Sequence, residues 1–119
     1  MIVLVVDDDT DTRDSLRDAL EDEGYTVLTA ANGSEALSTL ERTRPDVMLL
    51  DMMMPDTSGN AVYEQLQHRP GLASIPVVAV TAEPSRAPLG MPALEKPVRL
   101  GKLLELVALC CDAGRYGPR

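Results

Sequence analysis

Aromatic residues are nearly absent from this sequence. Of 119 residues, three are Tyr and none is Phe or Trp. The core must therefore be built from aliphatic side chains and Met, which favours closely layered packing. With 45% hydrophobic residues, a chain of this length fits one compact domain, because domains of roughly 100 to 150 residues are the commonest size. Two domains would not fit.

Cysteine is also scarce, and no hydrophobic run is long. The two cysteines, Cys110 and Cys111, are adjacent, so they close no useful loop and lack metal-ligand spacing. This favours a reduced, cytoplasmic compartment. The apolar run Ile2–Val6 ends at Asp7 and is too short for a signal-peptide core. No segment is long enough to span a membrane, so we expect no membrane insertion.

Positive charge is in the minority. Eleven Lys and Arg face nineteen Asp and Glu, which gives a formal net charge of -8. A surface of this sign repels phosphate backbones and anionic membranes. We therefore expect no direct contact with nucleic acid.

Short apolar runs alternate with amphipathic segments along the chain. Three runs rich in branched aliphatic residues predict strands that are buried on both faces, and hence parallel: Ile2–Val6, Val47–Leu50 and Val77–Val80. Tyr25–Ala30 suits a sheet edge, and Ala93–Glu95 predicts a very short fifth strand. Helical periodicity covers residues 11–23, 34–42, 59–68 and 100–111, with Asp9 as the N-terminal cap of the first helix. The pattern predicts an α/β doubly wound domain with helices on both faces of a five-stranded parallel sheet.

One crossover is unusual. Only fourteen residues separate Thr81 from Lys96, and Pro84, Pro88 and Pro92 interrupt them. Because a crossover needs at least ten to twelve residues, we expect at most a turn or two of helix, so the fourth helix is shortened or missing. The domain is expected to cover residues 1–111, with residues 112–119 as a flexible tail or the start of a linker.

Polar residues follow the predicted strands at their carboxyl ends, where ligands bind in open α/β sheets. Asp7 and Asp8 follow the first strand, and Asp51 ends the third. Thr81 ends the fourth strand, and Lys96 follows the fifth. Crowded carboxylates require a cation, and an oxygen-only ligand set suits Mg²⁺. One carboxylate then serves as a nucleophile toward a phosphoryl group, with Lys96 and Thr81 as donors to the product.

Four motifs, in this order along the chain, are together specific for one protein family. They are VLVVDDD at residues 3–9, LLDMMMPDTSG at 49–59, VTAE at 80–83 and EKP at 95–97. Together they cover nearly the whole chain, which resembles the receiver domain of two-component response regulators, the CheY-like family. The resemblance implies a flavodoxin-like sheet of order 2-1-3-4-5.

The resemblance also implies a phosphorelay function. Asp51 becomes the phosphoacceptor, and Asp7, Asp8, Asp51 and the backbone carbonyl of Met53 become Mg²⁺ ligands. The phosphoryl donor is a sensor histidine kinase or a histidine phosphotransfer protein. Apart from this self-phosphorylation and slow self-dephosphorylation, no enzymatic activity is expected.

The remaining implied roles concern the switch. Thr81 becomes the hydroxyl that moves toward the phosphoryl group, and Lys96 the cation that pairs with it. Ala82 is small where phosphate must enter, and Pro97 follows a cis peptide bond. From their positions beside the phosphoryl group, the side chains of Met53 and Glu83 are hypothesised to tune the lifetime of the phosphorylated form.

Two departures from the family pattern leave an alternative open. Ala93 stands where family members usually carry Tyr or Phe, so no aromatic ring is present to rotate as Thr81 moves. The shortened fourth helix alters the surface that output partners usually contact. The output partner is therefore unknown. The alternative is a degenerate receiver that acts as a phosphorylation-independent interaction module.

A second alternative rests on the spacing of Asp7 and Asp9. This spacing faintly resembles the nucleophile motif of haloacid-dehalogenase-type phosphatases. Asp11 stands where that motif requires Thr or Val, and the length leaves no room for a cap domain. Covalent phosphate on Asp7 instead of Asp51 would identify this class.

Overall fold

Five parallel strands form one sheet in the order β2-β1-β3-β4-β5. They are seen in a computed structural model that describes residues 1–54 and 58–116, with side chains described as far as Cys111. The strands are β1 (Ile2–Val6), β2 (Thr26–Ala30), β3 (Val47–Asp51), β4 (Val77–Thr81) and β5 (Ala93–Glu95). The predicted fold class and strand order are confirmed, and the mixed-polarity strand β2 lies at an edge.

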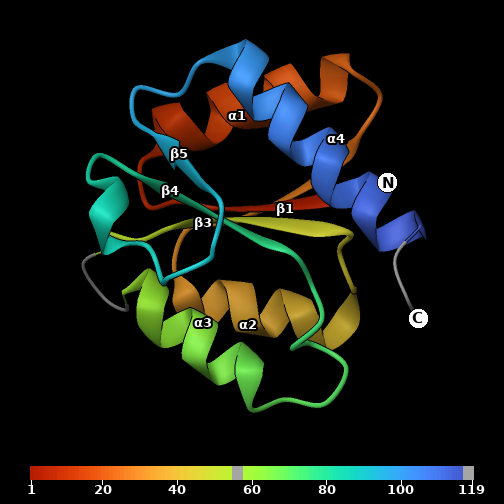
Figure 1. Cartoon of the computed structure of the whole chain (residues 1–119), viewed down its shortest axis with the longest axis vertical. Coiled ribbons are helices and arrows are strands. Elements are labelled where there is room, and N and C mark those ends of the chain that lie inside the picture. Colours follow the sequence, from red (N-terminus) through yellow and green to blue (C-terminus); the bar gives the residue numbers. More distant parts are fainter. Residues whose placement is uncertain (55–57, 117–119) are drawn as a thin grey trace.

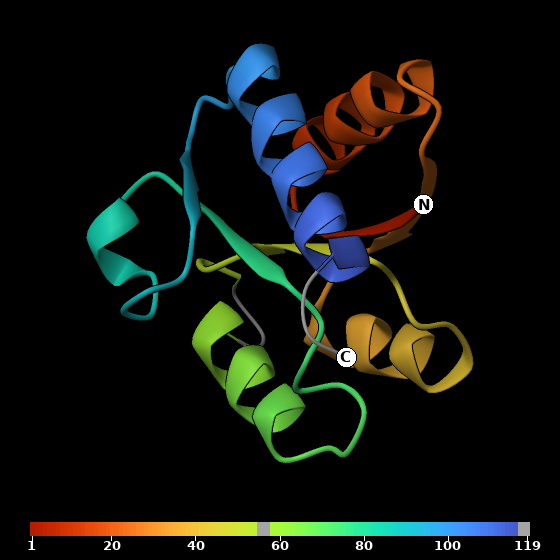
Figure 2. The same cartoon turned by 45° about the vertical axis from the view of Figure 1, so that its right-hand side comes forward.

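Helices cover both faces of the sheet (Figures 1 and 2). On one face lie α1 (Thr10–Asp22) and α4 (Leu100–Tyr116), and on the other lie α2 (Gly33–Arg42) and α3 (Gly59–Gln67). Helix α4 continues through residues 112–116, which we expected to begin a flexible tail; residues 117–119 lie outside the described part. None of the helices described is both long and apolar enough to cross a membrane.

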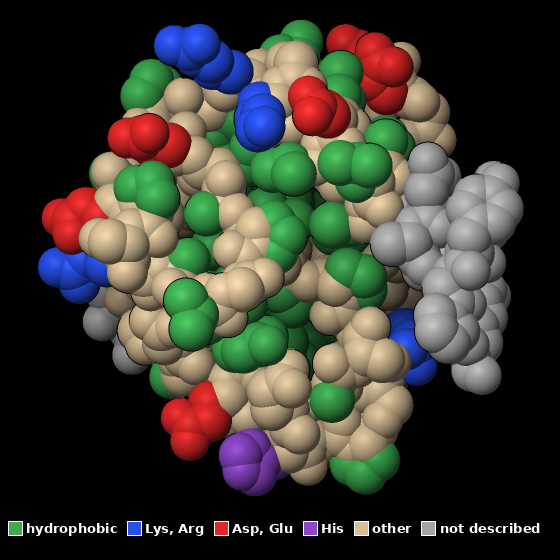
Figure 3. Space-filling model, viewed as in Figure 1, with side chains coloured by type: hydrophobic (Ala, Val, Ile, Leu, Met, Phe, Trp, Pro, Cys, Tyr) green, Lys and Arg blue, Asp and Glu red, His purple; other side chains and the backbone are tan. Residues whose placement is uncertain are grey.

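The connection from β4 to β5 contains no full α-helix. Its only helical element among the described residues is η1 (Pro84–Arg86), a single 3₁₀ turn that begins with a proline. The prediction of a shortened or missing fourth helix is therefore confirmed, because prolines cannot donate the backbone hydrogen bonds of a longer helix. Leu89 in this connection is fully exposed. Figure 3 shows the molecule from the same side as Figure 1. Hydrophobic side chains gather toward the middle of that side, and charged side chains lie mainly at its margin.

The core is aliphatic, as predicted, and lies on both sides of the sheet. Strands β3 and β4 are buried along their whole length. Alternate residues of β3 face opposite layers: Met48 and Leu50 pack toward α2 and α3, whereas Val47 and Leu49 pack toward α1 and α4. This packing on both faces fixes the strand ends that carry the polar residues.

Candidate functional site

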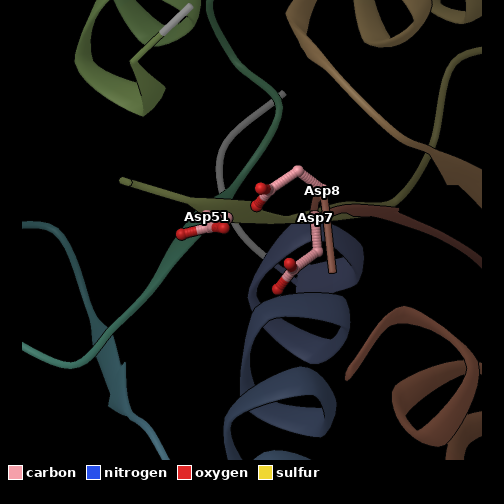
Figure 4. Close-up of side chains that lie close together, drawn as sticks. All are labelled: Asp7, Asp8 and Asp51. Atoms are coloured by element: carbon pink, nitrogen blue, oxygen red, sulfur yellow. The ribbon is translucent and has the colours of Figure 1, made fainter. Parts of the chain in front are cut away.

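Three aspartates meet at the carboxyl ends of β1 and β3. Each of Asp7, Asp8 and Asp51 offers a carboxylate oxygen, and these oxygens all lie within 4.8 Å of one another. Figure 4 shows the three side chains pointing toward a common space. Asp7 and Asp51 are each only 1% exposed, whereas Asp8 is exposed. The predicted convergence of these residues is confirmed.

Asp7 is fixed by its neighbours but has one unsatisfied oxygen. Its backbone N–H donates to the carbonyl of Ala30 at 3.1 Å, and its Oδ1 accepts from the N–H of Asp9 at 2.9 Å. Its buried Oδ2 lies 3.1 Å from Lys96 Nζ, but the contact lacks hydrogen-bond geometry and no hydrogen bond reaches this oxygen from the described residues. In the part of the chain that is described, this buried oxygen is therefore compensated by the charge of Lys96 alone, and its lone pairs have no hydrogen-bond donor.

Asp51 stands between a backbone donor and an ammonium group. Its Oδ1 accepts from the N–H of Met53 at 2.9 Å, and its Oδ2 lies 3.5 Å from Lys96 Nζ. Burial, followed by the charge of Asp7 and a hydrogen bond with Asp8, raises the pKa of Asp51 to about 6, against the opposing effects of Met53 and Lys96. A cation close to Asp51 would favour the charged form.

Lys96 is tied to β4 as well as to the carboxylates. Its backbone N–H donates to the carbonyl of Thr81 at 2.9 Å, and the predicted cis peptide bond to Pro97 is present. Burial disfavours the ammonium charge, but Asp7 and Asp51 outweigh that effect and raise the Lys96 pKa. Lys96 therefore stays protonated and compensates part of the acidic charge.

Thr81 is buried, and its hydroxyl is engaged in its own loop. Oγ1 accepts from the N–H of Glu83 at 3.0 Å and donates to the Glu83 carbonyl at 3.3 Å. Ala82 is exposed, and Ala93 is half-buried at the start of β5. Because a hydroxyl has one proton to donate, donation from Thr81 to a group bound to Asp51 would require it to release the Glu83 carbonyl.

Met53 and Glu83 have side chains at the surface. Met53 is 49% exposed, and the exposed Glu83 carboxylate pairs with Arg86 Nε at 2.7 Å. Their role in the lifetime of a phosphorylated form stays a prediction. Asp9, by contrast, is the N-terminal cap of α1, as predicted, and accepts from Thr12 Oγ1 at 2.6 Å.

Sequence reasoning missed the role of Gly59. A Cβ atom at this position would lie 2.5 Å from the Asp51 carbonyl oxygen and 2.8 Å from Met52 Cα, so α3 begins where only glycine fits against the end of β3. The signal was present, because Gly59 closes the motif that starts at Asp51. The sequence analysis also missed Arg13, whose Nη1 donates to the backbone carbonyl of Asp7 at 2.8 Å. No motif pointed to this residue.

The donor set fits a hard divalent cation. The three converging groups are all carboxylates, and Asp7 contributes a buried oxygen that lacks a hydrogen bond. Mg²⁺ prefers oxygen ligands and is often bound by only a few carboxylates, with water completing its shell. The residues present therefore suit Mg²⁺ better than a softer metal that selects sulfur or imidazole.

Comparisons with known proteins agree with this geometry. A family model described as "Response regulator receiver domain" matches residues 3–108. An uncharacterized 14.6 kDa protein in the sodA1 3′ region of Leptolyngbya boryana is 42% identical over 95% of this chain and 92% of its own length. Response regulator MprA of Mycobacterium ulcerans is 43% identical over 70% of this chain, but the match spans only 35% of MprA.

Solved structures show the same likeness. A CheY-like response regulator receiver domain protein from Methanospirillum hungatei superposes with a TM-score of 0.85 at 31% identity, covering 98% of each chain. The receiver domain of a signal transduction histidine kinase from Syntrophus aciditrophicus gives a TM-score of 0.87 at 28% identity, covering 98% of this chain and 94% of the other. The likeness thus extends over the whole domain.

Proposed function

The chain belongs to the response regulator receiver domain family of two-component signalling, and from this premise we propose that Asp51 accepts a phosphoryl group from phosphohistidine in a Mg²⁺-dependent reaction. The observation that carries the proposal is the buried Asp51 carboxylate, which lies beside the Lys96 ammonium and two further carboxylates. The anionic trio needs a cation, and Lys96 remains as a donor toward a phosphoryl group.

In the transfer step, a carboxylate oxygen of Asp51 forms a P–O bond while the P–N bond of phosphohistidine breaks. The imidazole leaves with the electron pair of that bond and takes up a proton from solvent. The Met53 N–H orients the Asp51 carboxylate, and Lys96 stabilises the charge on the phosphoryl oxygens. Mg²⁺, held by Asp7, Asp8, Asp51 and the carbonyl of Met53, would supply further neutralisation of that charge.

The switch follows from the added charge. Thr81 has its hydroxyl bound to the Glu83 backbone, and we propose that it leaves these partners to donate to the phosphoryl group. Lys96 shifts its pairing from Asp7 toward the same group. Because Lys96 is bonded through its backbone to Thr81, the two movements are coupled, and they bias a two-state equilibrium of the adjoining loops.

Receiver domains of this family interact with histidine kinases and output domains. For this chain we propose a sensor histidine kinase or a histidine phosphotransfer protein as donor, in the cytoplasm, where the thiols of Cys110 and Cys111 stay reduced. The output partner is unidentified, and we expect no direct nucleic-acid contact because of the net charge of -8.

Intact-mass analysis with a small phosphodonor tests the proposal. The parent should gain one phosphoryl group with Mg²⁺ and none with a chelator, whereas Asp51→Ala should gain none under either condition. Asp46→Ala is a matched control, because Asp46 also adjoins β3 but binds the N–H of Ile2; it should still be labelled. Labelling of Asp51→Ala equal to that of the parent would overturn the proposal.

A second candidate function is favoured by the β4–β5 connection. It contains only the turn η1, and Ala93 supplies no aromatic ring that could move with Thr81. A domain altered in this way suits an interaction module whose docking is independent of phosphate. This candidate predicts that a partner binds Asp51→Ala as tightly as the parent, whereas the phosphorylation switch predicts loss of regulated binding.

A further inference from the structure

Arg13, in the first turns of α1, directs its guanidinium at the loop that carries the acidic site. Its Nη1 donates to the backbone carbonyl of Asp7 at 2.8 Å, and its Nη2 lies 3.5 Å from Thr10 Oγ1. Within the described part of the chain it forms no ion pair with a carboxylate, although α1 is rich in Asp. Arg17, one turn later, behaves in the ordinary way and lies 3.4 Å from Asp14.

The bond from Arg13 completes the fixation of Asp7. The N–H of Asp7 is held by Ala30, and its Oδ1 is held by the N–H of Asp9. With Arg13 on the carbonyl, both backbone polar groups of Asp7 and one carboxylate oxygen have partners. The Asp7 carbonyl belongs to the peptide group that leads into Asp8, so holding it fixes one of the two peptide planes that together determine the direction of the Asp8 side chain.

This orientation matters because Asp8 is the exposed member of the trio. Repulsion from the buried carboxylates of Asp7 and Asp51 favours rotation of Asp8 into solvent. We propose that Arg13 is a positioning residue for the metal site: it fixes the Asp7–Asp8 peptide so that the three carboxylates converge before the cation binds. The inference rests on the proposed Mg²⁺-dependent function and assigns Arg13 no contact with the reacting atoms.

The charge of Arg13 and its positioning role predict opposite changes in Mg²⁺ affinity when Arg13 is replaced. A guanidinium near a cation site repels the cation, so if charge alone mattered, removal of Arg13 would tighten Mg²⁺ binding. If Arg13 orients the ligands, its removal weakens binding, because groups that orient metal ligands typically contribute about 10- to 100-fold to affinity. The sign of the change therefore separates the two effects.

Calorimetric titration of Mg²⁺ into the full chain makes this comparison. Arg13→Met keeps the aliphatic stem but removes the donors and the charge, and we expect roughly 10-fold weaker binding. Arg13→Lys keeps the charge and one donor and should fall between Arg13→Met and the parent. Arg17→Met removes the same charge from the same helix and should stay within about twofold of the parent. Affinity in Arg13→Met equal to or tighter than that of the parent overturns the inference.

A second measurement, made without metal, tests whether Arg13 orders residues 7–9. The amide of Asp9 is bonded to Asp7 Oδ1, so its hydrogen exchange, followed by NMR, should become faster in Arg13→Met and stay unchanged in Arg17→Met. Unchanged exchange in Arg13→Met contradicts the positioning role. A parent that binds no Mg²⁺ contradicts the proposed function and the metal role of Arg13, while exchange at Asp9 still decides whether Arg13 orders the loop.

Discussion

Lys96 Nζ lies 3.1 Å from Asp7 Oδ2 and 3.5 Å from Asp51 Oδ2. The ammonium is thus shared between the residue proposed to accept the phosphoryl group and a residue proposed to bind the metal. With Asp8 also present, one ammonium offsets three carboxylates, which leaves two negative charges when all are ionised. A divalent cation matches this remainder. Lys96, which pairs with Asp51, is then placed to contact a phosphoryl group on that residue.

Mg²⁺ should stabilise the folded protein through these carboxylates. A ligand that binds only the folded state at about 100 times its dissociation constant adds roughly 2.7 kcal/mol to the free energy of unfolding. We expect the parent to show such a gain in thermal melts and Asp8→Asn to lose most of it. Asp11→Asn removes an exposed carboxylate from α1 and should keep the gain. An equal gain in Asp8→Asn would contradict the assigned ligand.

Replacement of Asp51 should change the pH dependence of stability in the absence of metal. The folded-state pKa of about 6 exceeds the ordinary 3.8, so between these values the folded state binds more protons than the unfolded state. Stability therefore falls as pH rises through this window. Asp51→Asn should be more stable than the parent by about 1–3 kcal/mol at pH 7, with little difference near pH 4. Urea denaturation at pH 7 and near pH 4, with chelator present, measures the two stability differences. A stability difference that does not change with pH would contradict the raised pKa of Asp51.

Gly59 should tolerate no side chain. Gly59→Ala places Cβ against the Asp51 carbonyl and Met52, and overpacking of this kind costs roughly 1–3 kcal/mol. Gly101 is the matched control, since it lies in α4 with nothing within 4 Å of the added Cβ. Gly101→Ala should be neutral or slightly stabilising, by up to about 1 kcal/mol. Equal denaturation midpoints for the two variants would show that the close approach at Gly59 is unimportant.

The Thr81 hydroxyl should report the switch through the Glu83 amide. Phosphorylation should take Oγ1 away from the Glu83 N–H, which it accepts at 3.0 Å, and shift that amide signal in the NMR spectrum. Thr81→Val retains the shape and has no hydroxyl, so Asp51 should still be labelled while the Glu83 shift on labelling is lost. Thr81→Ser keeps the hydroxyl and should keep the shift. The same shift in Thr81→Val would place the switch elsewhere.

The fold and the meeting of the site residues could be predicted because parallel strands place their carboxyl ends at one edge of the sheet. Buried runs such as β3 identified the strands, and polar residues at their ends, such as Asp51, identified the site. The single turn η1 followed from the proline spacing. These features depend on local sequence and on one topological rule.

Other features depend on tertiary contacts that no local pattern contains. The acidic neighbours of Arg13 on α1 favour ion pairs, yet its guanidinium reaches the carbonyl of Asp7. The need for glycine at position 59 arises from the approach of α3 to the end of β3.

The most direct test of the account is the chemical identity of the phosphorylated residue. After reaction with a small phosphodonor and Mg²⁺, borohydride reduction converts an aspartyl phosphate to homoserine, which peptide mapping locates. We expect homoserine at position 51 alone, dependent on Mg²⁺ and absent from Asp51→Asn. Homoserine at position 7, or none at position 51 in the folded parent, would contradict it.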